Sequence, residues 1–235
     1  MSRRAIVLAG GKGTRLHPYT VVLPKPLMPI GEYPVLELIV RQLARRQFDE
    51  VTIAVNHQAE IIKAFFGDGS RWGIRIGYSL ESKPLGTIGP LRLIQELPEH
   101  FVLMNGDVLT DLDLNSLYER HIAEQRLFTI AATTRVNEID YGMLEESGGR
   151  LTGFHEKPKL EHLVSMGIYV VSRRIVDFIP PERDFGFDDL MLHLLAQNKP
   201  VHIERHQGYW LDIGRPDDYR QAIDDFEKHR ERFLP

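Results

Sequence analysis

The sequence predicts an α/β protein with a Rossmann-like, mostly parallel (mixed) sheet that is covered by helices on both faces. Three observations lead to this prediction. Short apolar segments alternate with segments of helical periodicity through residues 1–134, with roughly one repeat every twenty residues. Glycine or small polar residues bound the apolar segments, as is typical of buried parallel strands. Beyond Thr134 the strand-like segments follow one another closely, which indicates a small antiparallel part.

The first half of the chain supplies most of the expected sheet. Its first apolar run ends at a glycine pair, and the run at 74–80 alternates as a half-buried strand does. One expected helix begins with Pro34, and another is stopped by Gly67. The expected strands are residues 4–9, 51–55, 74–80, 101–104 and 128–134. The expected helices are residues 34–46, 59–66, 90–97 and 114–124.

The second half is expected to continue the same sheet and to add a small antiparallel part that covers a cleft. Gly148 and Gly149 have the composition of a hairpin turn between two of its strands. The expected strands are residues 142–145, 151–155, 165–171 and 201–205. The expected helices are residues 174–178, 188–197 and 216–232, and the last of them is charged. We expect one domain, residues 1–235, made of halves at 1–134 and 135–235.

Composition excludes several classes of function. The 235 residues carry a net charge of −4, which gives no reason to expect nucleic acid or an acidic membrane as a partner. The chain has no cysteine, so disulfides, thiolate zinc sites and cysteine nucleophiles are excluded. No segment resembles a secretory signal or a membrane span, so we expect a cytoplasmic protein. His202 and His206 lack a third ligand at zinc-like spacing, so we expect no histidine metal site.

A glycine-rich loop, LAGGKGTRLHPYT at residues 8–20, follows the first expected strand. Its spacing does not fit a P-loop, and Leu16 stands where a dinucleotide fingerprint needs its third glycine. A Rossmann dehydrogenase is therefore disfavoured. Gly10, Gly11 and Gly13 still allow backbone amides to approach an anion closely. Arg15 and Lys25 add two positive charges, so the loop predicts a phosphate site at the carboxyl end of a strand.

The segment from Leu8 to Pro29 resembles the signature of the sugar-nucleotide pyrophosphorylases, which are sugar-1-phosphate nucleotidyltransferases. Four further stretches match in the family's order: Pro84-Leu85-Gly86-Thr87, Asn105-Gly106-Asp107, Glu156-Lys157-Pro158 and Trp210-Leu211-Asp212-Ile213-Gly214. The chain looks most like the short mannose-1-phosphate guanylyltransferases. The resemblance implies a nucleotide-binding half at 1–134 and a sugar-binding half at 135–235. The carboxyl-terminal β-helix domain of larger relatives is not expected here.

The reaction implied by this resemblance is in-line attack of a sugar-phosphate oxygen on the α-phosphorus of a nucleoside triphosphate, with pyrophosphate as the leaving group. A phosphate monoester has a second pKa near ~6, so no general base is required. The difficulty is to bring two polyanions together, which calls for positioning and charge neutralisation. By resemblance, Arg15 and Lys25 are the catalytic residues that hold the phosphates.

The remaining roles also follow from the resemblance. Two carboxylates with phosphate oxygens suit Mg²⁺, and the family places Asp107 and Asp212 there. The sugar phosphate is expected to meet Gly142, Glu156 and Lys157. The nucleotide is expected to meet Leu8, Ala9, Gly10, Gly11, Gly13, Thr14, Glu81, Gly86 and Thr87. Asp111 and Asp113 are instead expected to cap the helix that begins at Leu114.

The base and the sugar are less well specified. Guanine presents two neighbouring donors that the carboxylate of Glu81 can accept together, whereas uracil and thymine offer a single donor, so GTP is favoured. Many relatives have Asn-Ala-Gly where this chain has Ser165-Met166-Gly167, which leaves the choice of sugar open. We expect GTP and mannose 1-phosphate as substrates. The alternatives are a uridylyl-, thymidylyl- or cytidylyltransferase on glucose 1-phosphate, a heptose-1-phosphate guanylyltransferase, and a non-catalytic regulator that binds sugar nucleotides. A homo-oligomer, supported by the last helix, is compatible with the sequence.

Overall fold

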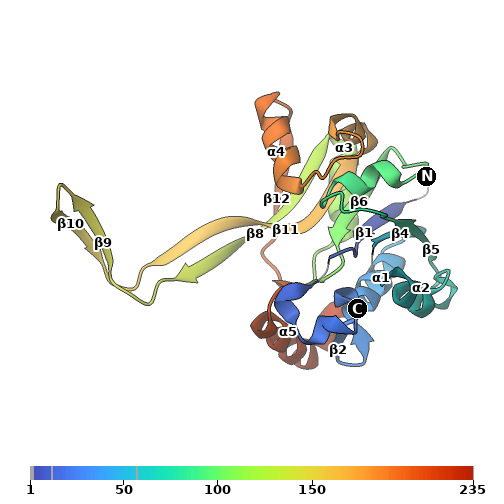
Figure 1. The fold of residues 1–235 in the computed structure, drawn as a ribbon, viewed down its shortest axis with the longest axis horizontal. Coiled ribbons are helices and arrows are strands. Elements are labelled where there is room, and N and C mark those ends of the chain that lie inside the picture. Colours follow the sequence, from blue (N-terminus) through green and yellow to red (C-terminus); the bar gives the residue numbers. More distant parts are fainter. Residues whose placement is uncertain (1–2, 12, 57, 235) are drawn as a thin grey trace.

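A seven-stranded mixed sheet forms the centre of the body in the computed structural model, which describes residues 3–11, 13–56 and 58–234 (Figure 1). The strand order is β12-β8-β11-β6-β1-β4-β5. Strand β1 pairs in parallel with β4 and with β6, and β4 pairs in parallel with β5. Strand β11 is antiparallel to both of its neighbours, β6 and β8. The predicted α/β class and mixed sheet are therefore confirmed.

The bounds of the sheet strands are β1 (Arg4–Leu8), β4 (Glu50–Val55), β5 (Arg75–Leu80), β6 (His100–Asn105), β8 (Phe128–Glu138), β11 (Lys159–Ser172) and β12 (Val201–Arg205). The helices are α1 (Val35–Arg45), α2 (Ala59–Phe66), α3 (Leu114–Ala123), α4 (Phe187–Ala196), α5 (Pro216–Lys228) and α6 (Arg230–Phe233). Short 3₁₀ segments are η1 (Thr14–Leu16), η2 (Tyr19–Val21), η3 (Lys25–Leu27), η4 (Ser70–Trp72), η5 (Gly89–Leu93) and η6 (Arg173–Phe178). Three small pairs complete the fold: β2 (Pro29–Ile30) with β3 (Tyr33–Pro34), β7 (Val108–Thr110) with β13 (Trp210–Asp212), and β9 (Met143–Ser147) with β10 (Arg150–His155).

Apolar side chains cover both faces of the sheet because successive residues of a strand point to opposite sides. Val7 of β1 belongs to a cluster with residues of α1, α2 and α3, whereas its neighbour Ile6 belongs to a cluster with residues of η5, η6 and α4. A third cluster joins Leu211 of β13 to Phe226 and Phe233 of the C-terminal helices. No helix among the described residues is both long and apolar enough to cross a membrane.

Two helix predictions are wrong. The segment predicted as a helix at 90–97 is the 3₁₀ helix η5, followed by extended backbone at Ile94. Leu91, Ile94 and Leu97 are all buried on the sheet, but only Leu91 lies within η5, and the positive φ of Glu96 is incompatible with a continued helix. The helix predicted at 216–232 is broken at His229, which allows Phe233 to stack on Phe226 with ring centroids 6.0 Å apart.

The antiparallel part of the second half also departs from expectation. Strands β8 and β11 are longer than predicted and run out of the body side by side, and the β9–β10 hairpin continues them. Figure 1 shows that this two-stranded arm points away from the body instead of covering a cleft. The predicted hairpin turn at Gly148 and Gly149 is confirmed, since both lie between β9 and β10 with positive φ. We call residues 134–165 the arm.

Candidate functional site

A cavity of about 540 Å³ lies at the carboxyl ends of the parallel strands β1, β4 and β6. Ligands of open α/β sheets bind at this edge, because the strand order changes direction there and leaves a crevice. The predicted nucleotide-binding and catalytic residues all line the cavity, together with one of the two predicted metal ligands. They are Leu8, Ala9, Gly10, Gly11, Gly13, Thr14, Arg15, Lys25, Glu81, Gly86, Thr87 and Asp107.

The glycine-rich loop is held in shape by backbone geometry that requires glycine. Gly13 has a φ of 62°, and a Cβ atom there would lie 2.8 Å from Cγ2 of Thr20. The Thr20 hydroxyl donates a hydrogen bond of 2.7 Å to the Gly13 carbonyl. The following residues turn into η1, which is anchored by the buried Leu16 and carries Arg15 at the cavity. Arg15 is therefore placed both by the local turn and by the packing of Leu16 against distant residues such as Leu211.

Lys25 and Asp107 form an ion pair in the cavity, through Nζ and Oδ2. Asp107 follows β6 after a close turn, in which the Gly106 amide donates to the Leu8 carbonyl at 2.9 Å. Both side chains are largely buried, with exposed fractions of 11% for Lys25 and 19% for Asp107. The other carboxylate oxygen of Asp107, Oδ1, is buried and has no hydrogen-bond partner among the described residues.

Asp212 reaches the same place from the far end of the chain. Strand β13 pairs with β7 so that Asp212 lies opposite Val108, and the Ile213 amide donates to the Asp107 carbonyl at 3.0 Å. Burial raises the pKa of Asp212, and the negative charge of Asp107 raises it further, while Lys25 and Arg15 act against both. The two predicted metal ligands are thus neighbours, although Asp212 itself does not line the cavity.

Asp107 and Asp212 are the residues that could hold a divalent cation. Among the described residues, no group of three or more histidine, cysteine, aspartate or glutamate side chains could hold one. Mg²⁺ commonly uses one or two carboxylates and takes its other ligands from water and phosphate oxygens. The unpartnered Oδ1 of Asp107 and the unfavourable charge on Asp212 both fit such a cation.

The opposite part of the cavity contains Glu81. Its Oε1 accepts a hydrogen bond of 3.0 Å from the Leu85 amide. Burial raises the pKa of Glu81, hydrogen bonds from the Leu85 amide and the Asn56 side chain lower it, and the charge of Asp184 raises it. A carboxylate has about four acceptor positions, so Glu81 retains capacity for a ligand.

Gly86 and Thr87 have structural roles beside their place in the cavity wall. Gly86 has a φ of 79°, and a Cβ atom there would lie 2.6 Å from the Phe185 carbonyl oxygen. The hydroxyl of Thr87 accepts a hydrogen bond of 2.8 Å from the amide of Phe187, the first residue of α4. These contacts fasten the segment after β5 to the segment before α4.

Three polar residues of the cavity wall were given no role from the sequence: Asn56, Asp184 and Asn105, of which Asn105 was named only as part of a matching stretch. Asn56 directly follows β4, and Asn105 ends β6, so their positions at strand ends were an available signal. The Asn56 amide donates to the Gly10 carbonyl and thereby supports the loop. Asp184 carried no such signal, because it reaches the cavity through contacts such as the 2.9 Å hydrogen bond from the Phe185 amide to the Leu85 carbonyl.

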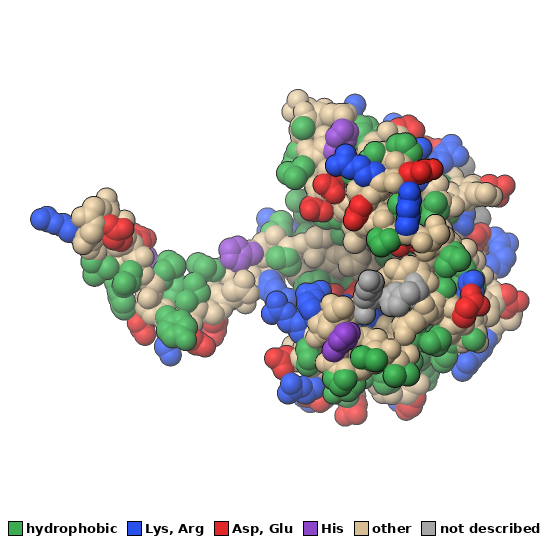
Figure 2. All heavy atoms as spheres, viewed as in Figure 1, with side chains coloured by type: hydrophobic (Ala, Val, Ile, Leu, Met, Phe, Trp, Pro, Cys, Tyr) green, Lys and Arg blue, Asp and Glu red, His purple; other side chains and the backbone are tan. Residues whose placement is uncertain are grey.

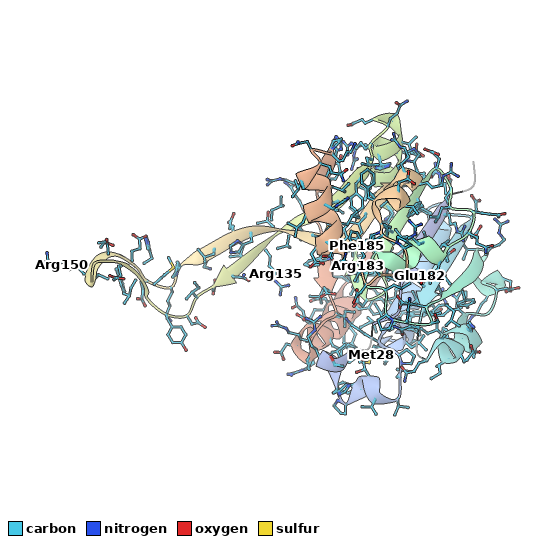
Figure 3. All side chains as sticks on the ribbon, turned by 45° about the horizontal axis from the view of Figure 1, so that its top comes forward. Met28, Arg135, Arg150, Glu182, Arg183 and Phe185 are labelled. Carbon is cyan, nitrogen blue, oxygen red and sulfur yellow. The ribbon has the colours of Figure 1, made fainter. Side chains whose placement is uncertain are left out.

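The predicted sugar-phosphate residues lie elsewhere. Gly142, Glu156 and Lys157 all belong to the arm and are exposed, and none of them lines the cavity. Gly142 and Glu156 are close to each other, since a Cβ atom on Gly142 would lie 3.2 Å from Oε2 of Glu156. Figure 3 shows how the arm carries its side chains, up to Arg150 at its tip, away from the body. The structure therefore separates these three residues from the other predicted site residues.

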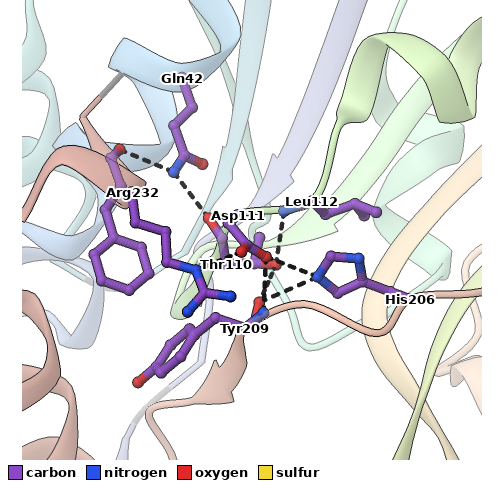
Figure 4. A network of polar contacts seen from close by, with 8 residues as sticks. Gln42, Thr110, Asp111, Leu112, His206, Tyr209 and Arg232 are labelled. Carbon is purple, nitrogen blue, oxygen red and sulfur yellow. Dashed lines mark hydrogen bonds and ion pairs between the residues drawn. The ribbon is translucent and has the colours of Figure 1, made fainter. Parts of the chain in front are cut away.

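Asp111 has a different role from the predicted helix cap (Figure 4). Its carboxylate accepts a hydrogen bond from the Tyr209 amide at 2.8 Å, contacts His206 Nε2 at 2.8 Å, and pairs with Arg232. The capping prediction for Asp111 is wrong, because the residue faces the chain segment before β13 instead of the helix. Asp113 does cap α3, accepting from the amides of Asn115 and Ser116.

Comparison with known proteins identifies the family. The family model described as "Nucleotidyl transferase" matches residues 4–229. This chain belongs to the nucleotidyl transferase family. The match takes in the loop, the cavity and the arm, so the resemblance carried by the sequence motifs is confirmed at the level of the family.

Two curated relatives and one solved structure are similar to this nucleotidyl transferase. It is 35% identical to a UTP–glucose-1-phosphate uridylyltransferase from Synechocystis sp., over 94% of the chain and 62% of that protein. It is 33% identical to a D-glycero-α-D-manno-heptose 1-phosphate guanylyltransferase from Aneurinibacillus thermoaerophilus, over 93% of the chain and 96% of that protein. The crystal structure of HddC from Yersinia pseudotuberculosis has the same fold, with a TM-score of 0.73, 24% identity and coverage of 95% and 99%. The chain thus spans about three-fifths of the uridylyltransferase and nearly all of the guanylyltransferase.

Proposed function

We propose that this nucleotidyl transferase joins a sugar 1-phosphate to a nucleoside triphosphate, giving a nucleoside diphosphate sugar and pyrophosphate. The observation that carries the proposal is the convergence of Arg15, Lys25, Asp107 and Asp212 on the glycine-rich loop. Two cations and two acidic residues meet at strand ends where backbone amides can approach phosphates. Such a site suits the neutralisation of several phosphate groups better than acid–base chemistry.

In the proposed mechanism the residues of the cavity position the triphosphate. Arg15 and Lys25 offset the charge that builds up on the leaving pyrophosphate. The loop glycines let amides reach the phosphates, and the sugar phosphate attacks in its ionised form, so no side chain has to remove a proton. The main contribution of the protein is to hold the attacking oxygen in line with the bond that breaks.

Asp107 and Asp212 would hold Mg²⁺ in this reaction. The unpartnered Oδ1 of Asp107 and the raised pKa of Asp212 support this assignment. When bound, Mg²⁺ supplies charge neutralisation at the phosphate oxygens. The pairing of Lys25 with the other oxygen of Asp107 would hold that carboxylate in its orientation.

We further propose that GTP and mannose 1-phosphate are the substrates. Glu81 supports guanine, because its remaining acceptor positions can take the two neighbouring donors of that base. The similarity to the manno-heptose guanylyltransferase, which extends over nearly that whole protein, is compatible with guanine and with a sugar of the manno configuration. The similarity to the uridylyltransferase favours UTP and glucose 1-phosphate as the second candidate pair.

A substrate matrix tests both levels of the proposal. GTP, UTP, dTTP, CTP and ATP are crossed with the 1-phosphates of mannose, glucose, N-acetylglucosamine, galactose and manno-heptose, with Mg²⁺, and pyrophosphate release is followed. We expect the strongest release from GTP with mannose 1-phosphate. Release only with UTP, dTTP or CTP would retain the reaction and reject guanine. No release from any pair, together with retention of sugar nucleotide, would favour a non-catalytic binding protein.

A further inference from the structure

The arm exposes large apolar side chains of the kind found at interfaces. None of residues 134–165 is buried. The large apolar side chains of the hairpin are among the most exposed of their kind in the described residues, at 79% for Tyr141, 64% for Leu144, 64% for Leu151 and 55% for Phe154. Figure 2 shows hydrophobic side chains gathered along the arm. An isolated two-stranded hairpin is at best marginally stable in water, so this ribbon is expected to pack against another surface.

The direction of the arm limits which surface that can be. Strands β8 and β11 pair without interruption from Lys159 opposite Glu138 to Ser165 opposite Ala132. At the root of the hairpin the Ile139 amide donates to the Pro158 carbonyl at 3.1 Å. The arm is therefore a continuous extension of the central sheet, and it leads away from the body (Figures 1 and 3). None of residues 134–165 lines the cavity.

The cavity, for its part, has few charges for a second polyanion. Among the described residues that line it, Arg15 and Lys25 are the cations, and Lys25 is paired with Asp107. Glu156 and Lys157, which the sequence resemblance assigns to the sugar phosphate, are exposed on the arm. A second copy of the chain has the same cavity, which also lacks Glu156 and Lys157. The arm of one copy could therefore supply these residues to the cavity of the other.

We propose that a second copy of this chain accepts the arm, so that Glu156 and Lys157 of one protomer complete the sugar-phosphate end of the other protomer's cavity. A two-fold axis makes this exchange reciprocal, since each copy both donates and receives an arm. The apolar side chains of the hairpin become buried on the partner. This inference rests on the proposed function for the role of Lys157, but the exchange itself is tested independently of activity.

Association is measured first, by sedimentation of the full chain. The wild type is expected to be a dimer. The double variant Leu144→Asp/Phe154→Asp is expected to be monomeric, with an unchanged circular dichroism spectrum because both side chains are exposed. Ile61→Asp, on the half-exposed face of α2, is the matched control and is expected to remain dimeric. A monomeric wild type, or a dimer that survives the arm substitutions, would overturn the proposal.

Cross-linking then tests where the arm goes, and the absence of cysteine from the chain gives a clean background. Chains with Lys157→Cys and chains with Gly11→Cys carry different tags, are mixed, and are treated with a short bismaleimide. A Cβ atom on Gly11 would meet nothing within 4 Å, so the substitution fits. We expect a covalent dimer that carries both tags. A cross-link that forms only inside a chain bearing both substitutions would show that the arm closes on its own cavity.

Complementation tests the shared site. Lys25→Ala and Lys157→Ala chains are co-expressed and the mixed dimers are isolated through two tags. If the arms are exchanged, one site of the mixed dimer contains both Lys25 and Lys157, and the other site contains neither. We therefore expect about half of the wild-type activity per dimer. Activity no higher than in either single variant would overturn the proposal, as would full activity of Lys157→Ala alone. An inactive wild type would instead reject the proposed function, and sedimentation and cross-linking would still decide the exchange.

Discussion

Lys25 and Asp107 form an ion pair although they are separated by 82 positions in the sequence. The pair joins the proline-rich segment after the glycine loop to the turn after β6. Lys25 pairs with Oδ2 of Asp107, whereas Oδ1 has no hydrogen-bond partner among the described residues and is available to a cation. This arrangement makes Asp107 the residue on which the proposed metal site depends most.

Asp107→Asn is expected to lower turnover by about 10²–10³-fold, the range found when a group that stabilises the transition state is removed. The amide keeps the shape of the side chain but loses the charge that holds Lys25 and a divalent cation. Circular dichroism should be unchanged. Asp217→Asn, at an exposed surface pair with Arg220, is the matched control and should retain activity. Near-normal turnover of Asp107→Asn with Mg²⁺ would reject the metal assignment.

Asp212→Asn is expected to stabilise the protein while it lowers turnover. The pKa of Asp212 is raised in the folded state from its ordinary value of 3.8, so its ionised form is less stable in the folded protein than in the unfolded chain. This penalty is absent below the unfolded pKa, develops as the pH rises from the unfolded to the folded pKa, and is fully present above the folded pKa. Thermal unfolding from pH 3.5 to 8 measures it.

At pH 7 we expect Asp212→Asn to have a higher melting temperature than the wild type. The difference between the two melting temperatures should narrow as the pH falls towards 3.8. Asp224→Asn, at an exposed position of α5, controls for a general loss of negative charge. A lower melting temperature at pH 7 for Asp212→Asn would show that the Asp212 carboxylate is compensated better than its burial indicates.

Glu81→Gln is expected to reduce the preference for GTP over UTP by roughly 10–100-fold, the effect of about 1–3 kcal/mol in one polar contact. The glutamine carbonyl can still accept from the Leu85 amide, so the local fold should persist. The measurement is kcat/KM for GTP and for UTP with one sugar 1-phosphate. Glu182→Gln, on the exposed loop before Asp184, is the control. Unchanged base selectivity would show that Glu81 does not read the base.

Asp111→Ala is expected to lower the free energy of unfolding by about 2–4 kcal/mol, because it leaves the Tyr209 amide and Arg232 without their shared acceptor. Turnover should also fall, since the same contacts support β13 and hence Asp212. Asp113→Ala, which removes the cap of α3 and a surface ion pair with Arg46, should cost about 1 kcal/mol and leave turnover unchanged. Urea unfolding and kcat distinguish the two variants. Equal losses in the free energy of unfolding for the two variants would mean that Asp111 stabilises the protein no more than a helix cap does.

Local patterns in the sequence determined most of the elements and most of the cavity. The alternation of apolar segments predicted the strands of the sheet because burial on a pleated surface repeats every second residue. The glycine spacing predicted the phosphate loop because close backbone approach depends on residues that are neighbours in the chain. Asn56 could have been added on the same grounds, since it directly follows a parallel strand.

Contacts between distant segments decided the rest. Leu91, Ile94 and Leu97 have a helical spacing, but the helix ends at Leu93, and Ile94 and Leu97 are buried on the sheet from non-helical backbone. Asp111 could have capped a helix, but its partners lie about a hundred residues further along the chain.

The arm is the clearest case of what tertiary structure alone decides. The sequence by itself determined that residues 142–155 form two strands with a glycine turn, because that pairing is local. Only the pairing of β8 with β11 decided that these strands extend the central sheet out of the body. Local sequence does not encode the direction of the arm. That direction depends on how far β8 and β11, which are distant in the sequence, continue to pair. The same pairing separated Glu156 and Lys157 from the cavity that the rest of the sequence had predicted for them.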